Sequence, residues 1–221
     1  LMEQRNKKGK NSLTGKPIFY FDSQICTGCK TCIIACRDKH DLEESIRWRR
    51  VVEYAGGNWQ CFPDGTFQQD VFAYYTSISC NHCEQPICVE VCPTTAMNRD
   101  ANGIVSVDHD KCMGCGYCAW ACPYSAPQFQ KSKGQMSKCD FCRSELENGY
   151  KPACVTSCPT HALNFILVDS TSEPIDDKMS MAPFPEYHLT KPNTHVKAHR
   201  SSQPSNSHIG NIANPEEIKD V

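Results

Sequence analysis

The chain has 221 residues, with 23 lysines and arginines against 25 aspartates and glutamates, and a formal charge of −2. No basic stripe stands apart from its cysteines, which excludes an obvious nucleic-acid-binding surface, and no stretch approaches the roughly 20 apolar residues of a membrane-spanning helix. Only 39% of the residues are hydrophobic, and that share includes 17 cysteines, so apolar burial alone gives a modest driving force for folding. The composition therefore points to bound metal, whose binding free energy becomes folding free energy.

The N-terminal half begins with residues 1–16, a polar and basic extension that lacks the apolar region of a secretory signal. Residues 17–22 are typical of a short strand leading into the first cysteines. Residues 37–79 form a β-rich insertion, with strands expected at 51–54 and 71–77 on either side of Gly56-Gly57.

Sixteen of the cysteines fall into four groups, each opening with two intervening residues and closing with three. Three closely spaced thiolates allow a short loop to surround one side of an iron–sulfur cubane. Gly28 and Gly114 lie between the first two cysteines of their groups, where a missing side chain permits positive φ and close approach of the backbone to a cluster. The groups are Cys26, Cys29, Cys32 and Cys36; Cys80, Cys83, Cys88 and Cys92; Cys112, Cys115, Cys118 and Cys122; and Cys139, Cys142, Cys154 and Cys158.

The spacing also predicts how the groups pair. In two-cluster ferredoxin runs, the fourth cysteine of one group ligates the cluster of the other. The second and third groups are close in sequence and pair with each other, which leaves the first and fourth to pair around them. The predicted ligands of four [4Fe–4S] clusters are Cys26, Cys29, Cys32 and Cys158 for cluster 1; Cys80, Cys83, Cys88 and Cys122 for cluster 2; Cys112, Cys115, Cys118 and Cys92 for cluster 3; and Cys139, Cys142, Cys154 and Cys36 for cluster 4.

Other uses of cysteine fit this pattern less well. Zinc ribbons also use paired C-x2-C units, but zinc sites rarely place four cysteines so close together four times over. A disulfide framework does not suit an odd number of cysteines in a chain of this length. A [3Fe–4S] cluster needs a missing ligand, and none is missing. Cys61 is left over and is expected to be a free thiol that binds no metal.

The segments between and after the cysteine groups predict the secondary structure and the charged residues around the clusters. A hairpin is expected from 96–99 and 104–107 around Asn102-Gly103, and a strand at 161–168. Short helices are expected to begin near the last cysteine of each group, with another at 140–147. His82 is interpreted as a residue beside a cluster and not as a ligand. Bound thiolates make an anionic centre, so nearby cations are expected to balance it; the candidates are Lys30, Arg37, Lys39, Lys111, Lys138 and Arg143.

The predicted fold class is α+β, with two nested ferredoxin-like units that each hold two clusters. Residues 80–138 form the inner unit, and residues 17–36 with 139–168 form the outer one. Residues 169–221 are rich in Pro, Ser, Asn and His and are expected to form an extended C-terminal arm. Its spaced apolar anchors are expected to pack mainly against another subunit, so that removing it would leave the clusters in place; the anchors are Phe184, Tyr187, Leu189 and Ile212.

Four such groups in this order resemble the iron–sulfur electron-transfer subunits of the molybdopterin oxidoreductase family. Within that family the insertion and the arm resemble the B subunits of the anaerobic dimethyl sulfoxide reductases. A nitrate reductase branch carries tryptophan at one cysteine of the third group, whereas this chain has Cys115. The segments that carry the resemblance are 51–60, 71–75, 79–84, 123–124, 126–128, 191–193 and 213–215.

The resemblance implies a non-catalytic subunit that relays electrons from a quinol-oxidising integral membrane anchor to a molybdopterin catalytic subunit, which reduces dimethyl sulfoxide or a similar S- or N-oxide. It implies a position peripheral to the cytoplasmic membrane, on its outer face, with the cytoplasmic side as the other option. The equivalent subunit of a polysulfide, thiosulfate or tetrathionate reductase is the alternative. An iron–sulfur redox sensor is a rival of another class, but no DNA-reading or partner-reading module is visible.

Overall fold

The computed structural model describes residues 15–168 and 180–218. The first sheet joins the N-terminal strand β1 to two strands from the C-terminal part of the chain. β1 pairs antiparallel with β10 and parallel with β11. The strand predicted at 17–22 is confirmed, and the one predicted at 161–168 begins later because His161 has a φ of +54°. The strands of this sheet are β1 (Lys16–Asp22), β10 (Leu163–Val168) and β11 (His195–Lys197).

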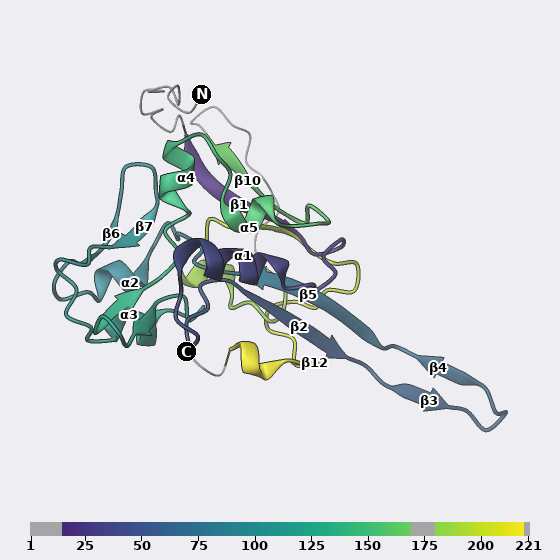
Figure 1. Ribbon diagram of the computed structural model, residues 1–221. Helices are drawn as coiled ribbons and strands as arrows, with labels where there is room; N and C mark the ends of the chain where they lie inside the picture. Colours follow the sequence, from purple (N-terminus) through teal and green to yellow (C-terminus); the bar gives the residue numbers. More distant parts are fainter. Residues whose placement is uncertain (1–14, 169–179, 219–221) are drawn as a thin grey trace, which may run out of the picture.

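The insertion forms the second sheet and a long projecting ribbon (Figure 1). β2 (Arg50–Gly56) and β5 (Phe72–Ile78) pair antiparallel, with β12 (Gly210–Ile212) on the free edge of β2. Beyond this sheet the chain continues as β3 (Trp59–Cys61) paired with β4 (Phe67–Gln69). Both strands predicted for the insertion are confirmed, and the ribbon leaves large apolar side chains exposed at its far end.

Two hairpins follow the second and third cysteine groups. β6 (Met97–Arg99) pairs with β7 (Val105–Val107), and Gly103 in their turn has a φ of +80°, as the Asn-Gly pair predicts. β8 (Gln128–Gln130) pairs with β9 (Gln135–Ser137).

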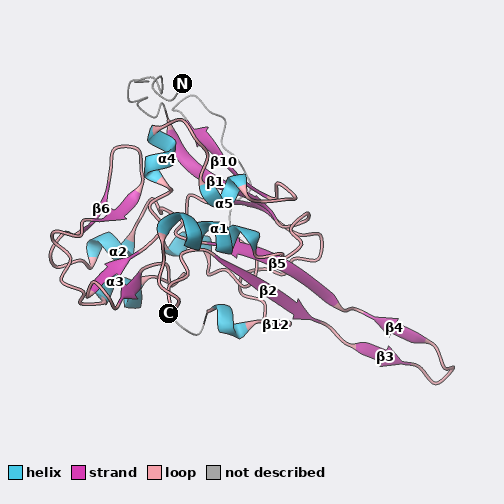
Figure 2. Cartoon of the chain, in the orientation of Figure 1, coloured by secondary structure: helices cyan, strands magenta, loops and turns pink. Residues whose placement is uncertain are grey.

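The helices are short and are separated by loops (Figure 2). The expectation that they begin near the last cysteine is wrong, because α2, α3 and α5 end just before it. Residues before proline disfavour helical backbone, and a proline follows each of those cysteines. Cys36 is followed by arginine, so α1 continues through it to His40, while the helix expected at 140–147 begins at Arg143. The helices are α1 (Thr31–His40), α2 (Ile87–Glu90), α3 (Tyr117–Ala121), α4 (Arg143–Glu147) and α5 (Ala153–Thr156).

The C-terminal segment 180–218 packs on its own chain, so the expectation that it packs mainly against another subunit is wrong for these residues. Phe184 and Val196 are buried in the main core. Glu84 N donates to Lys191 O at 2.9 Å, close to the second cysteine group. Of the expected anchors only Phe184 is fully buried, and Leu189 is exposed. The expectation was based on the few apolar residues of the arm, whereas the edges of β1 and β2 supply backbone partners for β11 and β12.

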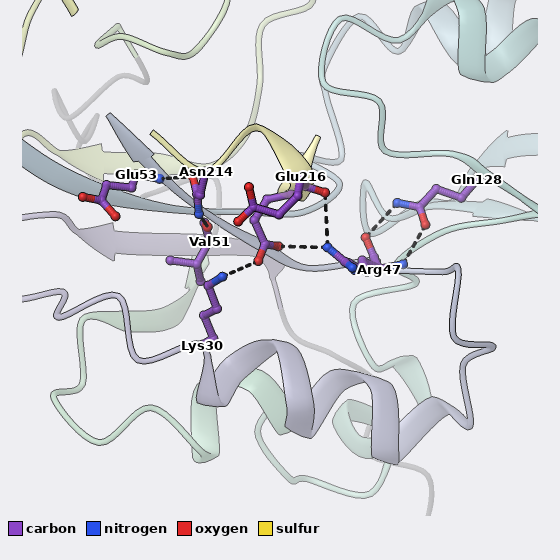
Figure 3. A network of polar contacts seen from close by, with 8 residues as sticks. Lys30, Arg47, Val51, Glu53, Gln128, Asn214 and Glu216 are labelled. Atoms are coloured by element: carbon purple, nitrogen blue, oxygen red, sulfur yellow. Dashed lines mark hydrogen bonds and ion pairs between the residues drawn. The ribbon is translucent and has the colours of Figure 1, made fainter. Parts of the chain in front are cut away.

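Polar contacts hold the end of this segment in place (Figure 3). The Asn214 side chain forms two hydrogen bonds to the backbone of β2. Its Oδ1 accepts from Glu53 N at 2.8 Å, and its Nδ2 donates to Val51 O at 2.9 Å. The nearly buried Glu217, in the 3₁₀ turn Pro215–Glu217, pairs with Lys30 at 2.6 Å. A second 3₁₀ turn covers Tyr187–Leu189.

Candidate iron–sulfur sites

Three small, apolar-lined cavities are each surrounded by four cysteines, and in each case three cysteines come from one group and the fourth from another. We number these sites as the predicted clusters. The cysteines that line them are Cys26, Cys29, Cys32 and Cys158 at site 1; Cys80, Cys83, Cys88 and Cys122 at site 2; and Cys112, Cys115, Cys118 and Cys92 at site 3.

The remaining four predicted ligands also lie together, and they form site 4. Burial and the neighbouring thiols Cys154 and Cys142 raise the pKa of Cys36. Burial, Cys36 and Cys142 likewise raise the pKa of Cys139 well above its usual range. Helix α1, which carries Cys36, packs against α5, which carries Cys154, and His40 at the end of α1 lies 3.2 Å from Cys142 Sγ. These contacts bring the first and fourth groups together, and with Cys139 they make the fourth set of four cysteines drawn from two groups.

Backbone N–H groups of the described residues donate to cysteine sulfurs at several of the sites. Met97 N lies 3.3 Å from Cys92 Sγ, and Met136 N lies 3.4 Å from Cys112 Sγ. Leu163 N lies 3.5 Å from Cys158 Sγ. Such donors stabilise negative charge on cluster-bound sulfur.

The donor set fits a cluster of several irons. Within residues 15–168 and 180–218, no group of three or more His, Cys, Asp or Glu side chains converges tightly enough to hold a single metal ion. The cysteines of sites 1–3 instead surround a cavity, which is the arrangement that four irons at the corners of a cubane require, and thiolate is the ligand of such clusters.

The residue before the second cysteine of each group has left-handed backbone. Gly28 and Gly114 have φ values of +67° and +73°, which confirms the prediction of positive φ. A Cβ on Gly28 would lie 2.5 Å from the Tyr75 ring, and one on Gly114 would lie 2.2 Å from Gly134 O. The close approach that demands glycine is therefore to protein atoms.

Burial sets the charge state of these thiols. It raises the pKa of Cys26 and Cys118 to about 11, and that of Cys83 and Cys142 to about 12. Without iron, these thiols stay protonated at neutral pH. Binding of a cluster therefore releases protons, and the positive iron supplies the charge that stabilises the thiolates.

The expected cations divide into surface and buried residues. Lys39 pairs with Glu145 and Arg143 with Asp100, so both are balanced by carboxylates. Lys138 is buried, with its Nζ on backbone carbonyls. Arg49 is also buried, but it was not among the expected cations, because it lies in the insertion far from the cysteine groups in sequence.

Two histidines and the leftover cysteine complete the surroundings. His40, at the end of α1, places Nε2 3.2 Å from Cys142 Sγ, a contact that the sequence did not suggest. His82 is buried, and its Nδ1 accepts from Val105 N at 3.0 Å. Cys61 is exposed on the projecting ribbon, where its Sγ lies 3.8 Å from Phe62 O.

These sites, on a ferredoxin-like α+β frame, define an iron–sulfur protein of the ferredoxin class. A family model described as a 4Fe-4S dicluster domain matches residues 71–168. The B subunit of the anaerobic dimethyl sulfoxide reductase of Escherichia coli K12 is 50% identical over 200 residues, covering 90% of this chain and 97% of that protein. The chain is a member of this family of dimethyl sulfoxide reductase B subunits.

Further relatives include another dimethyl sulfoxide reductase B subunit and a subunit of a different reductase. The corresponding B subunit of Haemophilus influenzae is 48% identical over 200 residues, covering 90% of this chain and 98% of that protein. The thiosulfate reductase electron transfer subunit PhsB of Salmonella typhi is 38% identical over 162 residues, covering 73% and 81% of the two chains. None of the helices in the described ranges is long and apolar enough to cross a membrane.

Proposed function

We propose that this chain is a non-catalytic electron-transfer subunit that holds four [4Fe–4S] clusters, with the cysteines of sites 1–4 as their ligands. The observation that carries the proposal is the crossed arrangement: each set takes three cysteines from one group and one from another. Site 4 takes its single cysteine, Cys36, from the first group. When bound, such clusters supply one-electron transfer, and the protein holds them, excludes water and adjusts their potentials.

The crossing gives two nested ferredoxin-like units. Sites 2 and 3 share the second and third groups and form the inner unit, residues 80–138. Sites 1 and 4 share the first and fourth groups and form the outer unit, residues 17–36 and 139–168. The pairing of β1 with β10 supports this division, because it brings the two halves of the outer unit together.

Contacts between the sets support a linear order of sites 1, 4, 2 and 3. Cys32 of site 1 interacts electrostatically with Cys154 of site 4. Cys139 of site 4 interacts in the same way with Cys80 of site 2. Helix α2, which carries Cys88 of site 2, packs against α3, which carries Cys118 of site 3. Electrons would therefore enter at one end of this line and leave at the other.

Exposed apolar surfaces near the two ends support partners at both. Beside site 3, α3 exposes Tyr117 and Trp120, whose ring centroids lie 5.7 Å apart next to an open groove. Near site 1, Ile25 precedes Cys26 in the chain and is exposed, and Tyr75 packs on Gly28. Apolar patches of this kind mark interaction surfaces.

The partners follow from the family. Electrons pass from a quinol-oxidising membrane anchor through this chain to a molybdopterin subunit that reduces dimethyl sulfoxide or a similar S- or N-oxide. The complex lies at the cytoplasmic membrane, with this chain peripheral on the outer face. The similarity to PhsB makes the equivalent role in a thiosulfate reductase the second candidate.

Metal analysis of the anaerobically purified chain tests the proposal. We expect roughly sixteen irons and as many acid-labile sulfides per chain, and several EPR-active centres after reduction. Stoichiometric zinc, or iron for only two clusters, would overturn it. Co-purification with a molybdopterin subunit, followed by assay with dimethyl sulfoxide and with thiosulfate, separates the two candidate acceptors.

A further inference from the structure

Arg49 is a buried cation whose partners are all neutral. It is 2% exposed and lies just before β2. Its Nη1 donates to Ser77 Oγ at 3.1 Å, its Nη2 donates to Ser79 Oγ at 2.9 Å, and its guanidinium lies 4.6 Å above the Phe19 ring. A guanidinium remains protonated in proteins, so a full positive charge is enclosed here.

Lys138 is a second buried cation of the same kind. It is 4% exposed and lines the cavity of site 2. Its Nζ donates to Val105 O and, at 2.8 Å, to Cys139 O. Since both contacts have the nitrogen as donor to a carbonyl, they fit an ammonium.

Among the described residues neither cation forms an ion pair with a carboxylate, which contrasts with the paired Lys39 and Arg143 at the surface. A charge taken out of water is costly unless an opposite charge compensates it. The groups near enough to do so are cysteine sulfurs. Ser77, which accepts from Arg49, has its Oγ 3.6 Å from Cys32 Sγ of site 1. The sulfurs that raise the pKa of Arg49 belong to sites 1 and 4, namely Cys154, Cys32, Cys139 and Cys36. Lys138 interacts with sulfurs of sites 2 and 4, namely Cys80, Cys139 and Cys88.

We propose that Arg49 and Lys138 are charge-positioning residues, each placed between two adjacent clusters, where they stabilise the reduced forms. Arg49 serves sites 1 and 4, and Lys138 serves sites 4 and 2. The inference rests on the proposed ligand sets. A reduced cluster carries one more negative charge than an oxidised one, so a fixed cation nearby raises the reduction potential. The same cation weakens the repulsion between neighbouring clusters that are both reduced.

Site 3 is the internal comparison. Burial and the companion thiols Cys92, Cys112 and Cys115 raise the pKa of Cys118 there, and no basic residue is among the main causes. The basic residue next to this site in sequence, Lys111, is 58% exposed and pairs with Asp108 at 3.0 Å. A solvated and paired cation is screened, so Lys111 has little influence on a cluster at site 3.

The test is an EPR-monitored redox titration of the full-length, cluster-loaded chain, in which each cluster takes one electron from the chemical reductant. Arg49→Gln and Lys138→Gln remove the charge but keep an amide donor. We expect Lys138→Gln to make reduction at sites 2 and 4 at least tenfold less favourable, which equals a fall of about 59 mV for one electron. Arg49→Gln should do the same at sites 1 and 4.

The control variants separate charge from packing. Lys138→Arg and Arg49→Lys keep the charge and should keep potentials close to those of the parent chain, while Lys111→Gln should leave all four unchanged. Unchanged potentials in a glutamine variant with full iron content would overturn the inference, and so would an equal shift at every site. Loss of a cluster in both the glutamine and the charge-conserving variant would show a purely structural role and also overturn it. A parent chain with fewer than four clusters would instead refute the proposed function.

Discussion

His82 and Phe141 occupy the same place in two different cysteine groups, directly before the second cysteine, and their ring centroids lie 5.2 Å apart. Both have left-handed backbone, with φ values of +44° and +65°, where the other two groups have glycine. A left-handed residue with a side chain costs about 1–2 kcal/mol. Burying a phenylalanine gains about 1.5–3 kcal/mol, so packing offsets the cost at Phe141. The two rings thus link the second and fourth cysteine groups by a direct side-chain contact.

Phe141→Ala should be strongly destabilising, by about 3–5 kcal/mol, because Phe141 is 1% exposed and stacks on Phe19 at 4.0 Å. Phe141→Gly should lose less than Phe141→Ala, since glycine removes the left-handed penalty. The measurement is the temperature at which the clusters bleach, compared at one scan rate. Phe67→Ala, on the exposed ribbon, serves as the control and should change stability by less than about 0.5 kcal/mol. Equal effects at the two positions would contradict this account.

Gly114→Ala should disturb site 3 far more than Gly116→Ala. Both glycines have left-handed φ, +73° and +80°, so the backbone penalty is shared. Only at Gly114 would the new Cβ collide with backbone, at 2.2 Å from Gly134 O, whereas the space around Gly116 is open. Iron analysis should show a loss of roughly four irons for Gly114→Ala and none for Gly116→Ala. The same iron content in both variants would show that the turn adapts to the added methyl group.

Local rules predicted much of this molecule from the sequence. The β1 strand, the Asn-Gly hairpin and the positive φ of Gly28 follow from patterns of a few residues each. The helix positions could also have been predicted. The last two cysteines of each group are four residues apart, about one helical turn, and the proline that follows the last cysteine in three groups requires the helix to end before that cysteine. What could not be predicted depends on distant partners. The buried position of Arg49 and the pairing of β11 with β1 arise only when the chain closes around the sites.

Cysteine replacements test the crossed ligation directly. Cys122→Ser should remove the same EPR signal as Cys88→Ser, although Cys122 lies in the third group, because both cysteines line site 2. Cys118→Ser should remove a different signal, that of site 3. If Cys122→Ser and Cys118→Ser instead removed one common signal, each group would hold its own cluster. Cys61→Ser is the matched control, and it should leave the iron content unchanged because Cys61 is exposed on the ribbon.

Removal of the C-terminal segment should cost a cluster, in contrast to the expectation from composition. Thr190 Oγ1 lies 3.3 Å from Cys83 Sγ, and Asn193 donates to His82 O, so this segment covers site 2. A chain ending at Val168 should therefore lose the EPR signal that Cys88→Ser also removes.

A shorter truncation provides the control. A chain ending at Ser207 keeps Thr190 and Asn193 but loses β12 and the bonds that Asn214 makes to β2. It should bleach at a lower temperature, because each hydrogen bond lost from the edge of β2 contributes about 0.5–1.5 kcal/mol, yet it should retain its full iron content. Full iron content in the chain ending at Val168 would show that the segment is not needed at site 2. Loss of the site 2 signal in the chain ending at Ser207 would assign the effect to β12 and residues after it.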